Sequence, residues 1–140
     1  MSNNKLLSFV IPAYCEQENL RPTHQAIKSI MEKNLPAYDW EIIFVDDGST
    51  DNSAKLLADL SSQDRKCRVI ELSRNFGKEI ALSAGVDYAS GDAVICLDAD
   101  LQHPPERIPD MVLEWEKGAE VVEMIRERSG REPWLRRIGS

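Results

Sequence analysis

Short runs of apolar, β-branched residues alternate with helix-forming segments along most of the chain, and this alternation limits the possible folds more than any other feature. Such runs favour β-strands, and the polar, Gly or Pro residues that bound them favour turns. The expected strands are residues 6–11, 40–45, 68–72, 93–97 and 120–125. Strands separated by helices in this way pair in parallel through right-handed crossovers. We therefore expect a single α/β domain with a mostly parallel sheet flanked by helices.

Four helices are expected between these strands, because apolar residues recur there at intervals of three or four. The residues that mark them are Ile27, Ile30 and Met31; Ala54, Leu57, Ala58 and Leu60; Ile80, Ala81, Ala84 and Tyr88; and Ile108, Met111, Val112 and Trp115. The first helix tolerates Pro22 in its first turn, whereas the fourth begins at Pro104 and Pro105 and ends near Gly118. The final segment, EPWLRRIGS, is expected to begin an element that the chain does not complete.

The composition is that of an ordinary soluble globular domain. The 140 residues are 42% hydrophobic, and their formal net charge of −7 argues against nonspecific binding of nucleic acid, which needs a basic surface. Three cysteines without metal-ligand spacing indicate a reducing compartment. No signal peptide or membrane-spanning run is recognisable, so the chain as given is expected to be cytosolic. The arginines near its end are either a solvated tail or a contact for an anionic ligand or membrane surface, and both readings remain open.

The segment DAVICLDADLQHPPE, residues 92–106, places two carboxylates one residue apart directly after an apolar run. Alternate residues of a strand point the same way, so Asp98 and Asp100 are expected to share one face. Two like charges this close repel each other, and a divalent cation would relieve the repulsion. Hard carboxylate oxygens suit Mg²⁺ or Mn²⁺ better than Zn²⁺. We therefore expect a metal site at the carboxyl end of this strand, although D-x-D without its strand context is a weak signal.

Ligands of open parallel sheets bind beyond the carboxyl ends of the strands, where the strand order reverses. The polar loops after the first, second and fourth strands belong at this edge, and they carry Tyr14, Glu16, Asp46, Asp47, Asp98 and Asp100. A tyrosine ring can stack on a base or sugar, and carboxylates can accept hydrogen bonds from base N–H or ribose hydroxyl groups. The loops match neither the G-x-G-x-x-G dinucleotide motif nor the G-x-x-x-x-G-K-[ST] P-loop. The pattern predicts a nucleoside-diphosphate site without a glycine-rich loop.

Each of these signals has a simpler reading. On its own, DDGSTD at residues 46–51 is more often a turn and helix cap, and His103 is expected to be an ordinary loop residue. Cys15 belongs near the expected crevice, but nothing nearby in the sequence clearly lowers its pKa. The order and spacing of all the segments together carry the prediction.

Four segments together resemble the successive motifs of family 2 glycosyltransferases. They are FVIPAYCEQENL, EIIFVDDGSTDNS, LSRNFGKEIALSAG and DAVICLDADLQHPPE, and they cover essentially the whole chain. RNFGKE with DADLQHPPE is most similar to the polyprenyl-phosphate branch, which contains bacterial undecaprenyl-phosphate sugar transferases and dolichyl-phosphate mannose synthases. The resemblance implies a GT-A fold, a UDP- or GDP-linked sugar donor, Mg²⁺ or Mn²⁺, and a polyprenyl phosphate acceptor. It further implies a full-length protein at the cytosolic face of the membrane, with homo-oligomers left open.

The resemblance also implies roles for particular residues. These are nucleotide contacts for Pro12, Ala13, Tyr14, Glu16, Val45 and Asp47; metal binding and catalysis for Asp98 and Asp100; a position beside the donor for Ala99; a metal or phosphate contact for Gln102; and a contact with the donor diphosphate for Arg126. Two departures from the family pattern stand out. Cys15 occupies a position where the family usually has asparagine, and Glu123 and Met124 stand where small or aromatic residues are commoner.

The implied reaction is a direct displacement with inversion at the anomeric carbon. A metal ion and an arginine can neutralise the leaving diphosphate, and the acceptor phosphate monoester is already largely anionic near neutral pH. Members of this branch continue beyond the matched motifs, so we expect residues 1–140 to be a truncated, N-terminal donor-binding domain without turnover of its own.

The sequence is also compatible, to different degrees, with two functions other than sugar transfer. A nucleotide-sensing or assembly module on the same fold stays open, because a fold alone does not determine function. A haloacid-dehalogenase-like phosphatase is disfavoured, because D-x-D here follows the fourth expected strand rather than the first.

Overall fold

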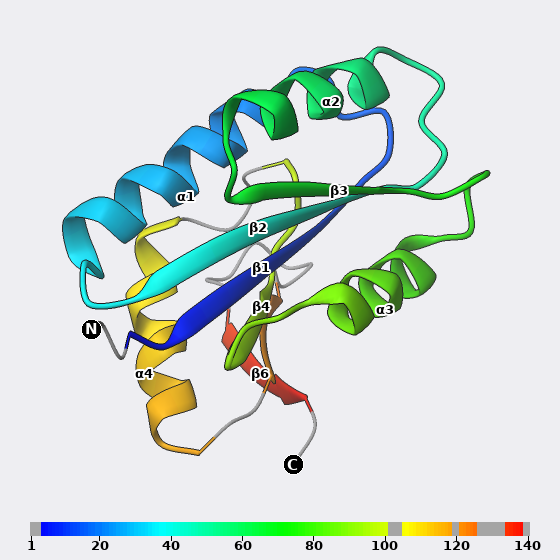
Figure 1. Ribbon diagram of the computed structural model, residues 1–140. Coiled ribbons are helices and arrows are strands. Elements are labelled where there is room, and N and C mark those ends of the chain that lie inside the picture. The colour runs from blue at the N-terminus through cyan, green and yellow to red at the C-terminus, as the bar shows by residue number, and fades with distance from the viewer. Residues whose placement is uncertain (1–3, 101–104, 119–120, 126–133, 139–140) are drawn as a thin grey trace.

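The computed structural model of the chain describes residues 4–100, 105–118, 121–125 and 134–138, which form one six-stranded sheet covered by helices (Figure 1). The strands are β1 (Leu6–Ala13), β2 (Asp39–Asp46), β3 (Cys67–Glu71), β4 (Ala93–Cys96), β5 (Val121–Ile125) and β6 (Trp134–Ile138). The helices are α1 (Leu20–Asn34), α2 (Ser53–Gln63), α3 (Lys78–Tyr88) and α4 (Ile108–Glu116), and the 3₁₀ turn η1 (Pro105–Arg107) precedes α4. The strand order is β3-β2-β1-β4-β5-β6, with β1 to β5 parallel and β6 antiparallel to β5. The expected mostly parallel α/β sheet is confirmed.

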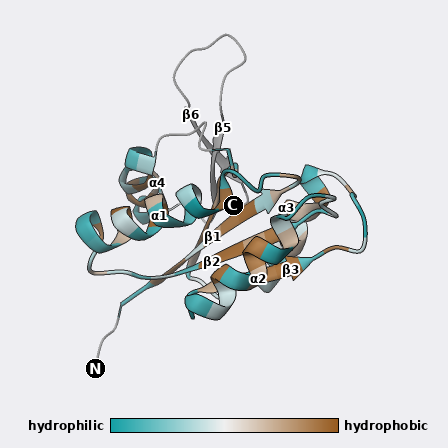
Figure 2. Ribbon diagram, turned by 90° about the horizontal axis from the view of Figure 1, so that it is seen from above, coloured by the Kyte–Doolittle hydropathy of each residue, from teal (hydrophilic) through white to brown (hydrophobic). Residues whose placement is uncertain are grey.

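Side chains of β1 alternate between two hydrophobic cores, one on each face of the sheet. Leu7, Phe9 and Ile11 join the core shared with α1, α2 and α4, whereas Val10 joins the core shared with α3. Strand β2 alternates in the same way. Figure 2 shows the hydrophobic residues concentrated along these central strands and hydrophilic ones along the outer helix surfaces. Because both faces of the sheet are covered, the strands appear in the sequence as nearly continuous apolar runs.

Helix α3 lies very close to the sheet. Its buried residues are Ala81 and Gly85, and a Cβ atom built on Gly85 would lie 2.3 Å from Cγ1 of Val10. The small size of these two residues permits this close packing. Ile80 and Tyr88, which helped to mark this helix, are 52% and 59% exposed. Ile80 directly precedes Ala81 and is turned by about 100° from it around the helix axis, while Tyr88 is the final residue of the helix.

Two segments differ from the expected strand pattern. Strand β1 does not stop at Pro12 but pairs through it to Ala13. Because β4 pairs with β1 only as far as Val10, β1 has a single neighbour at Pro12, where a proline is tolerated as on an edge strand. The expectation of an incomplete element at the end of the chain was wrong, since residues 134–138 complete strand β6. Its structure depends on pairing with β5, which the local sequence does not reveal.

A buried polar cluster connects the strands at the amino edge of the sheet. Ser8 Oγ donates a 2.6 Å hydrogen bond to Glu41 Oε2, and the Ser90 N–H donates one of 2.8 Å to the same oxygen. Arg68 Nη1 donates a 3.0 Å hydrogen bond to Glu41 Oε1. Burial raises the pKa of Glu41, but the hydrogen bonds from Ser8, Ser90 and Arg68 together outweigh it and hold the pKa below its ordinary value of 4.5. The ionised carboxylate therefore stabilises this edge.

Candidate functional site

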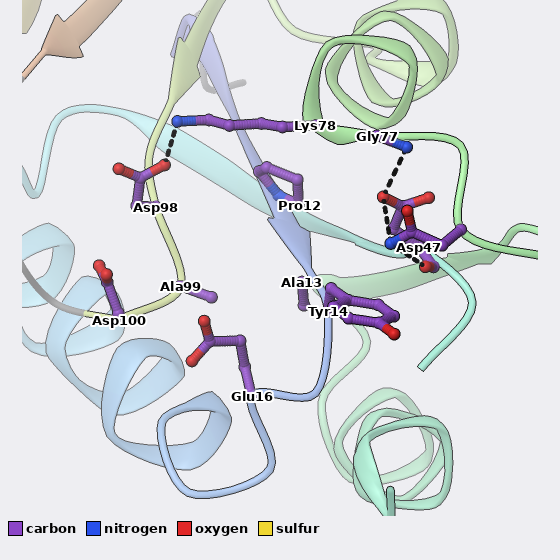
Figure 3. A pocket seen from close by; sticks show the side chains of 11 residues that line it. Pro12, Ala13, Tyr14, Glu16, Asp47, Gly77, Lys78, Asp98, Ala99 and Asp100 are labelled. Atoms are coloured by element: carbon purple, nitrogen blue, oxygen red, sulfur yellow. Dashed lines mark hydrogen bonds and ion pairs between the residues drawn. The ribbon is translucent and has the colours of Figure 1, made fainter. Parts of the chain in front are cut away.

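A pocket of about 480 Å³ opens at the carboxyl edge of the sheet, between the loops that follow β1, β2 and β4 and the segment that begins α3 (Figure 3). The residues that line it are Pro12, Ala13, Tyr14, Glu16, Asp47, Asn75, Gly77, Lys78, Asp98, Ala99 and Asp100. The strand order reverses beside β1, because β2 lies on one side of it and β4 on the other. Open α/β sheets bind ligands at this point. The expected convergence of the three loops is confirmed.

The loop after β1 is held against the loop after β2 by backbone-to-side-chain hydrogen bonds. The Cys15 N–H donates to Ser49 Oγ at 2.9 Å, and the Glu16 N–H donates to buried Ser53 Oγ at 3.0 Å. Tyr14 lines the pocket and is 47% exposed, so it is accessible to a ligand there. These bonds give the pocket wall a defined shape before any ligand binds.

Cys15 adopts a left-handed backbone conformation, with a φ angle of 53°. Asparagine enters this region more readily than most residues do, which gives a physical reason for the asparagine usual in the family at this position. The Sγ atom lies 3.4 Å from Thr50 Oγ1, and hydrogen bonds from the Thr50 hydroxyl and N–H hold the pKa of Cys15 below its ordinary value. The prediction that nothing nearby lowers this pKa was therefore wrong.

The DDGSTD segment forms a turn and a helix start, as its simpler reading predicts. The Ser49 N–H donates a 3.0 Å hydrogen bond to Asp46 Oδ1, which closes the turn. The Ser53 N–H, at the first residue of α2, donates one of 2.9 Å to Asp51 Oδ1. Of this segment, only Asp47 lines the pocket, whereas Asp46 and Asp51 stabilise the turn and the helix start.

Asp47 binds the segment that leads into α3. Its Oδ1 accepts a hydrogen bond from the Phe76 N–H at 2.8 Å, and its Oδ2 accepts one from the Gly77 N–H at 3.0 Å. The side-chain amide of Asn75 also donates to Oδ2, at 3.3 Å. Asp47 is 3% exposed. Asp47 lies at the pocket, as the resemblance implies. Its carboxylate oxygens are already used to hold the RNFGKE segment in place.

Asp98 and Asp100 both line the pocket, although β4 ends before either of them. They therefore reach it from the turn after the strand and not by strand alternation. Oδ1 of Asp98 forms a 2.7 Å ion pair with Nζ of Lys78, which reaches across the pocket in Figure 3. Buried Ala99 lies between the two, and its carbonyl oxygen accepts a 2.8 Å hydrogen bond from Thr23 Oγ1 of α1. This bond anchors the turn that carries both carboxylates.

Val45 has an implied role but is not among the described residues that line the pocket. Val45 is fully buried in the core beneath α3, because alternation along β2 directs its side chain to that face. The Val45 side chain therefore does not line the described pocket, and the implied nucleotide contact of this residue stays a prediction. Gln102 and Arg126 lie outside the described residues.

Asn75, Gly77 and Lys78 line the pocket but were assigned no role from the sequence. The signal that could have found them is the RNFGKE motif, which was recognised as specific to the family branch. The hydrogen bonds that Asp47 accepts from this connector place it beside the turn of Asp98, and the sequence alone does not reveal these bonds.

The carboxylate oxygens of the pocket provide some, but not all, of the ligands that a divalent cation needs. Among the residues that the structure describes, no group of three or more His, Cys, Asp or Glu side chains could enclose a metal ion. The two carboxylates of Asp98 and Asp100 line one pocket, and Mg²⁺ and Mn²⁺ are commonly held by one or two carboxylates together with substrate phosphates and water. The residues present therefore fit an ion that shares its coordination with a bound diphosphate.

Residues 8–140 match the family described as "Glycosyl transferase family 2". The chain belongs to this family. The resemblance of the four motifs is thereby confirmed over nearly the whole chain. Within the described parts of this family 2 chain, no helix has both the length and the apolar character needed to cross a membrane.

Similar family 2 proteins include two named undecaprenyl-phosphate 4-deoxy-4-formamido-L-arabinose transferases. The one from Proteus mirabilis is 43% identical over 136 residues, which are 96% of this chain and 40% of that protein. The one from Pseudomonas fluorescens is 47% identical over 125 residues, which are 86% of this chain and 35% of that protein. The chain thus spans about two fifths of the length of these relatives.

A solved structure supports the fold. It is the mannosyltransferase from Pyrobaculum calidifontis in complex with GDP-Man and Mn²⁺, with a TM-score of 0.66 and 22% identity. The match covers 81% of this chain and 33% of the mannosyltransferase. The expected GT-A fold is confirmed.

Proposed function

We propose that this chain is the donor-binding part of a glycosyltransferase that moves a sugar from a nucleoside diphosphate to a polyprenyl phosphate. The observation that carries the proposal is the single pocket that gathers Tyr14, Glu16, Asp98 and Asp100 at the reversal point of a family 2 sheet. The exposed ring of Tyr14 can stack on a base or sugar, and Glu16 can accept hydrogen bonds from base or ribose groups.

We propose that the donor diphosphate lies on the side of the pocket formed by Asp98 and Asp100, with Mg²⁺ or Mn²⁺ between the phosphates and the two carboxylates. When bound, the ion would neutralise the charge that develops on the leaving nucleoside diphosphate. The solved mannosyltransferase neighbour holds GDP-Man and Mn²⁺, which agrees with this proposal. Gln102 and Arg126 are proposed to add contacts with the metal or the diphosphate, as the family motifs imply.

The proposed acceptor follows from the named relatives, which act on undecaprenyl phosphate. A phosphate monoester is largely ionised near neutral pH, so its oxygen attacks the anomeric carbon without a strong general base. Direct displacement would invert that carbon. Because polyprenyl phosphates are membrane lipids, we propose that the longer protein acts at the cytosolic face of the membrane.

A thermal-shift panel of UDP- and GDP-linked sugars, with Mn²⁺ or with a chelator, tests donor binding by this chain. We expect at least one nucleotide sugar to raise the melting temperature, and to raise it further with Mn²⁺. No shift with any member of the panel would contradict the proposal.

A transfer assay with undecaprenyl phosphate tests whether this chain contains the acceptor site as well as the donor site. Because the chain spans about two fifths of its relatives, we expect donor binding without glycolipid formation by the 140-residue chain. Glycolipid formation by this chain alone would show that the acceptor site lies within it. Binding of the nucleotide without transfer by a longer protein that contains this chain would favour a nucleotide-sensing module.

A further inference from the structure

The pocket contains one positive charge among several negative ones. Among its described lining residues, Lys78 is the only cationic side chain, whereas Glu16, Asp47, Asp98 and Asp100 carry carboxylates. A nucleoside diphosphate is itself anionic, so these carboxylates repel it unless cations intervene. Among the described lining residues Lys78 supplies such a cation, and a bound divalent ion would supply another.

The position of Lys78 is determined by the chain before it. Hydrogen bonds from the Phe76 and Gly77 N–H groups to Asp47 fix the backbone where α3 begins, and Lys78 is the first residue of that helix. The same connector packs tightly on Gly48, because a Cβ atom built there would lie 2.4 Å from the backbone of Arg74. The backbone that carries the Lys78 side chain is therefore held in a fixed position.

From this point, Lys78 reaches Asp98 on the opposite wall. Its Nζ lies 2.7 Å from Asp98 Oδ1, and Figure 3 shows the extended side chain passing over Pro12. The Lys78 side chain is 56% exposed and that of Asp98 is 27% exposed. Ion pairs this exposed contribute little to stability, so their exchange for another partner costs little. A lysine also moves its charge easily on its flexible four-carbon stem.

We propose that Lys78 exchanges partners when the donor binds: it holds Asp98 while the metal is absent, and it contacts the donor diphosphate once a divalent cation occupies Asp98. This inference rests on the proposed function and adds a phosphate-binding residue to it. The ammonium and the cation compete for the same carboxylate oxygen, whereas both attract the same diphosphate. Removal of the Lys78 charge should therefore affect metal binding and nucleotide binding in opposite directions.

The test uses the 140-residue chain and its Lys78→Met, Lys78→Arg and Lys33→Met variants. Lys33→Met is the matched control, because it removes the same charge from an exposed position in the last turn of α1. Electron paramagnetic resonance of free Mn²⁺ gives the metal affinity, and calorimetry at saturating Mn²⁺ gives the affinities for UDP and GDP. Circular dichroism verifies that each variant is folded.

In Lys78→Met we expect Mn²⁺ to bind about two- to fivefold more tightly, since the competing ion pair is gone. We also expect this variant to bind UDP or GDP, whichever the parent chain binds, about tenfold more weakly than the parent does, since a charge-assisted contact is lost. Lys78→Arg should lie closer to the parent in both measurements, and Lys33→Met should equal it.

Two results would overturn the inference. If the parent chain binds Mn²⁺ and nucleotide but Lys78→Met leaves either affinity unchanged, or shifts both in the same direction, the exchange is wrong while the proposed function stands. If the parent chain binds neither Mn²⁺ nor UDP or GDP, the proposed function fails and the exchange fails with it.

Discussion

Asp47 and Gly77 join two loops that are thirty residues apart in the chain, through a 3.0 Å hydrogen bond from the Gly77 N–H to Asp47 Oδ2. Asp47 directly follows β2, and Gly77 directly precedes α3. The bond therefore connects the end of a central strand to the start of the helix that carries Lys78. Because Asp47 is buried, the pocket depends on an interaction inside the protein as well as on groups that face a ligand.

Replacing Asp47 with Asn is expected to loosen this connection. The amide keeps one acceptor oxygen but turns an N–H₂ donor toward a backbone N–H, which leaves a buried group without a partner. We expect the free energy of unfolding, measured with urea, to fall by about 1–3 kcal/mol. Asp59→Asn, on the exposed side of α2, is the control and should leave it unchanged. Equal stability of Asp47→Asn and the parent would mean that the connector is held by other contacts.

Replacing Gly85 with Ala sets helix propensity against packing. Alanine favours a helix over glycine by about 1 kcal/mol. The added Cβ would lie 2.3 Å from Val10 Cγ1 and 3.0 Å from Val45 Cγ2, and overpacking of this kind costs about 1–3 kcal/mol. We expect a net loss of stability in chemical denaturation, whereas Ser83→Ala on the exposed face of α3 should be neutral or slightly stabilising. A stabilised Gly85→Ala variant would show that α3 lies farther from the sheet.

Much of the fold could be predicted because β-branched runs and helical spacing are local properties. The limits appear where a residue's surroundings come from distant parts of the chain. Val45 lies in a run that is buried on both faces, so the run shows no alternation from which its direction could be read. Strand β6 likewise depends on its pairing with β5.

The same distinction between local and long-range information applies to the candidate site. Asp98 and Asp100 belong to a compact motif, and their place at the pocket follows from the sheet edge. Lys78 could not be assigned a role, because its position depends on hydrogen bonds between Asp47 and the connector. Long-range contacts of this kind leave no local pattern in a single sequence.

Glu41→Gln tests the polar cluster at the amino edge of the sheet. The pKa of Glu41 is lowered in the folded chain, so its ionised form contributes stability that is present above the ordinary value of 4.5 and is lost as the pH falls through the folded-state pKa. We expect Gln at this position to reduce the free energy of unfolding by about 1–3 kcal/mol at pH 7. The difference between parent and variant should shrink below pH 4.5 in urea denaturation. A difference that stays constant with pH would contradict this account of the cluster.

Cys15→Asn tests the left-handed position in the loop after β1. With a φ angle of 53°, this residue adopts a conformation that asparagine enters more readily than cysteine does. We expect Asn to preserve or slightly raise the melting temperature, and Cys15→Val to lower it because β-branched residues are strained there. If Val is tolerated as well as Asn, the loop does not require the left-handed conformation.

The central claim is that Asp98 and Asp100 hold the metal that binds the donor diphosphate, and calorimetry of UDP and GDP binding tests it most directly. The parent chain and its Asp98→Asn, Asp100→Asn and Asp87→Asn variants are compared with Mn²⁺ and with a chelator, with Asp87 as an exposed control on α3. We predict that Mn²⁺ strengthens nucleotide binding by the parent and by Asp87→Asn, and that this gain disappears in both pocket variants. An equal Mn²⁺-dependent gain in Asp98→Asn, Asp100→Asn and the parent would contradict the account.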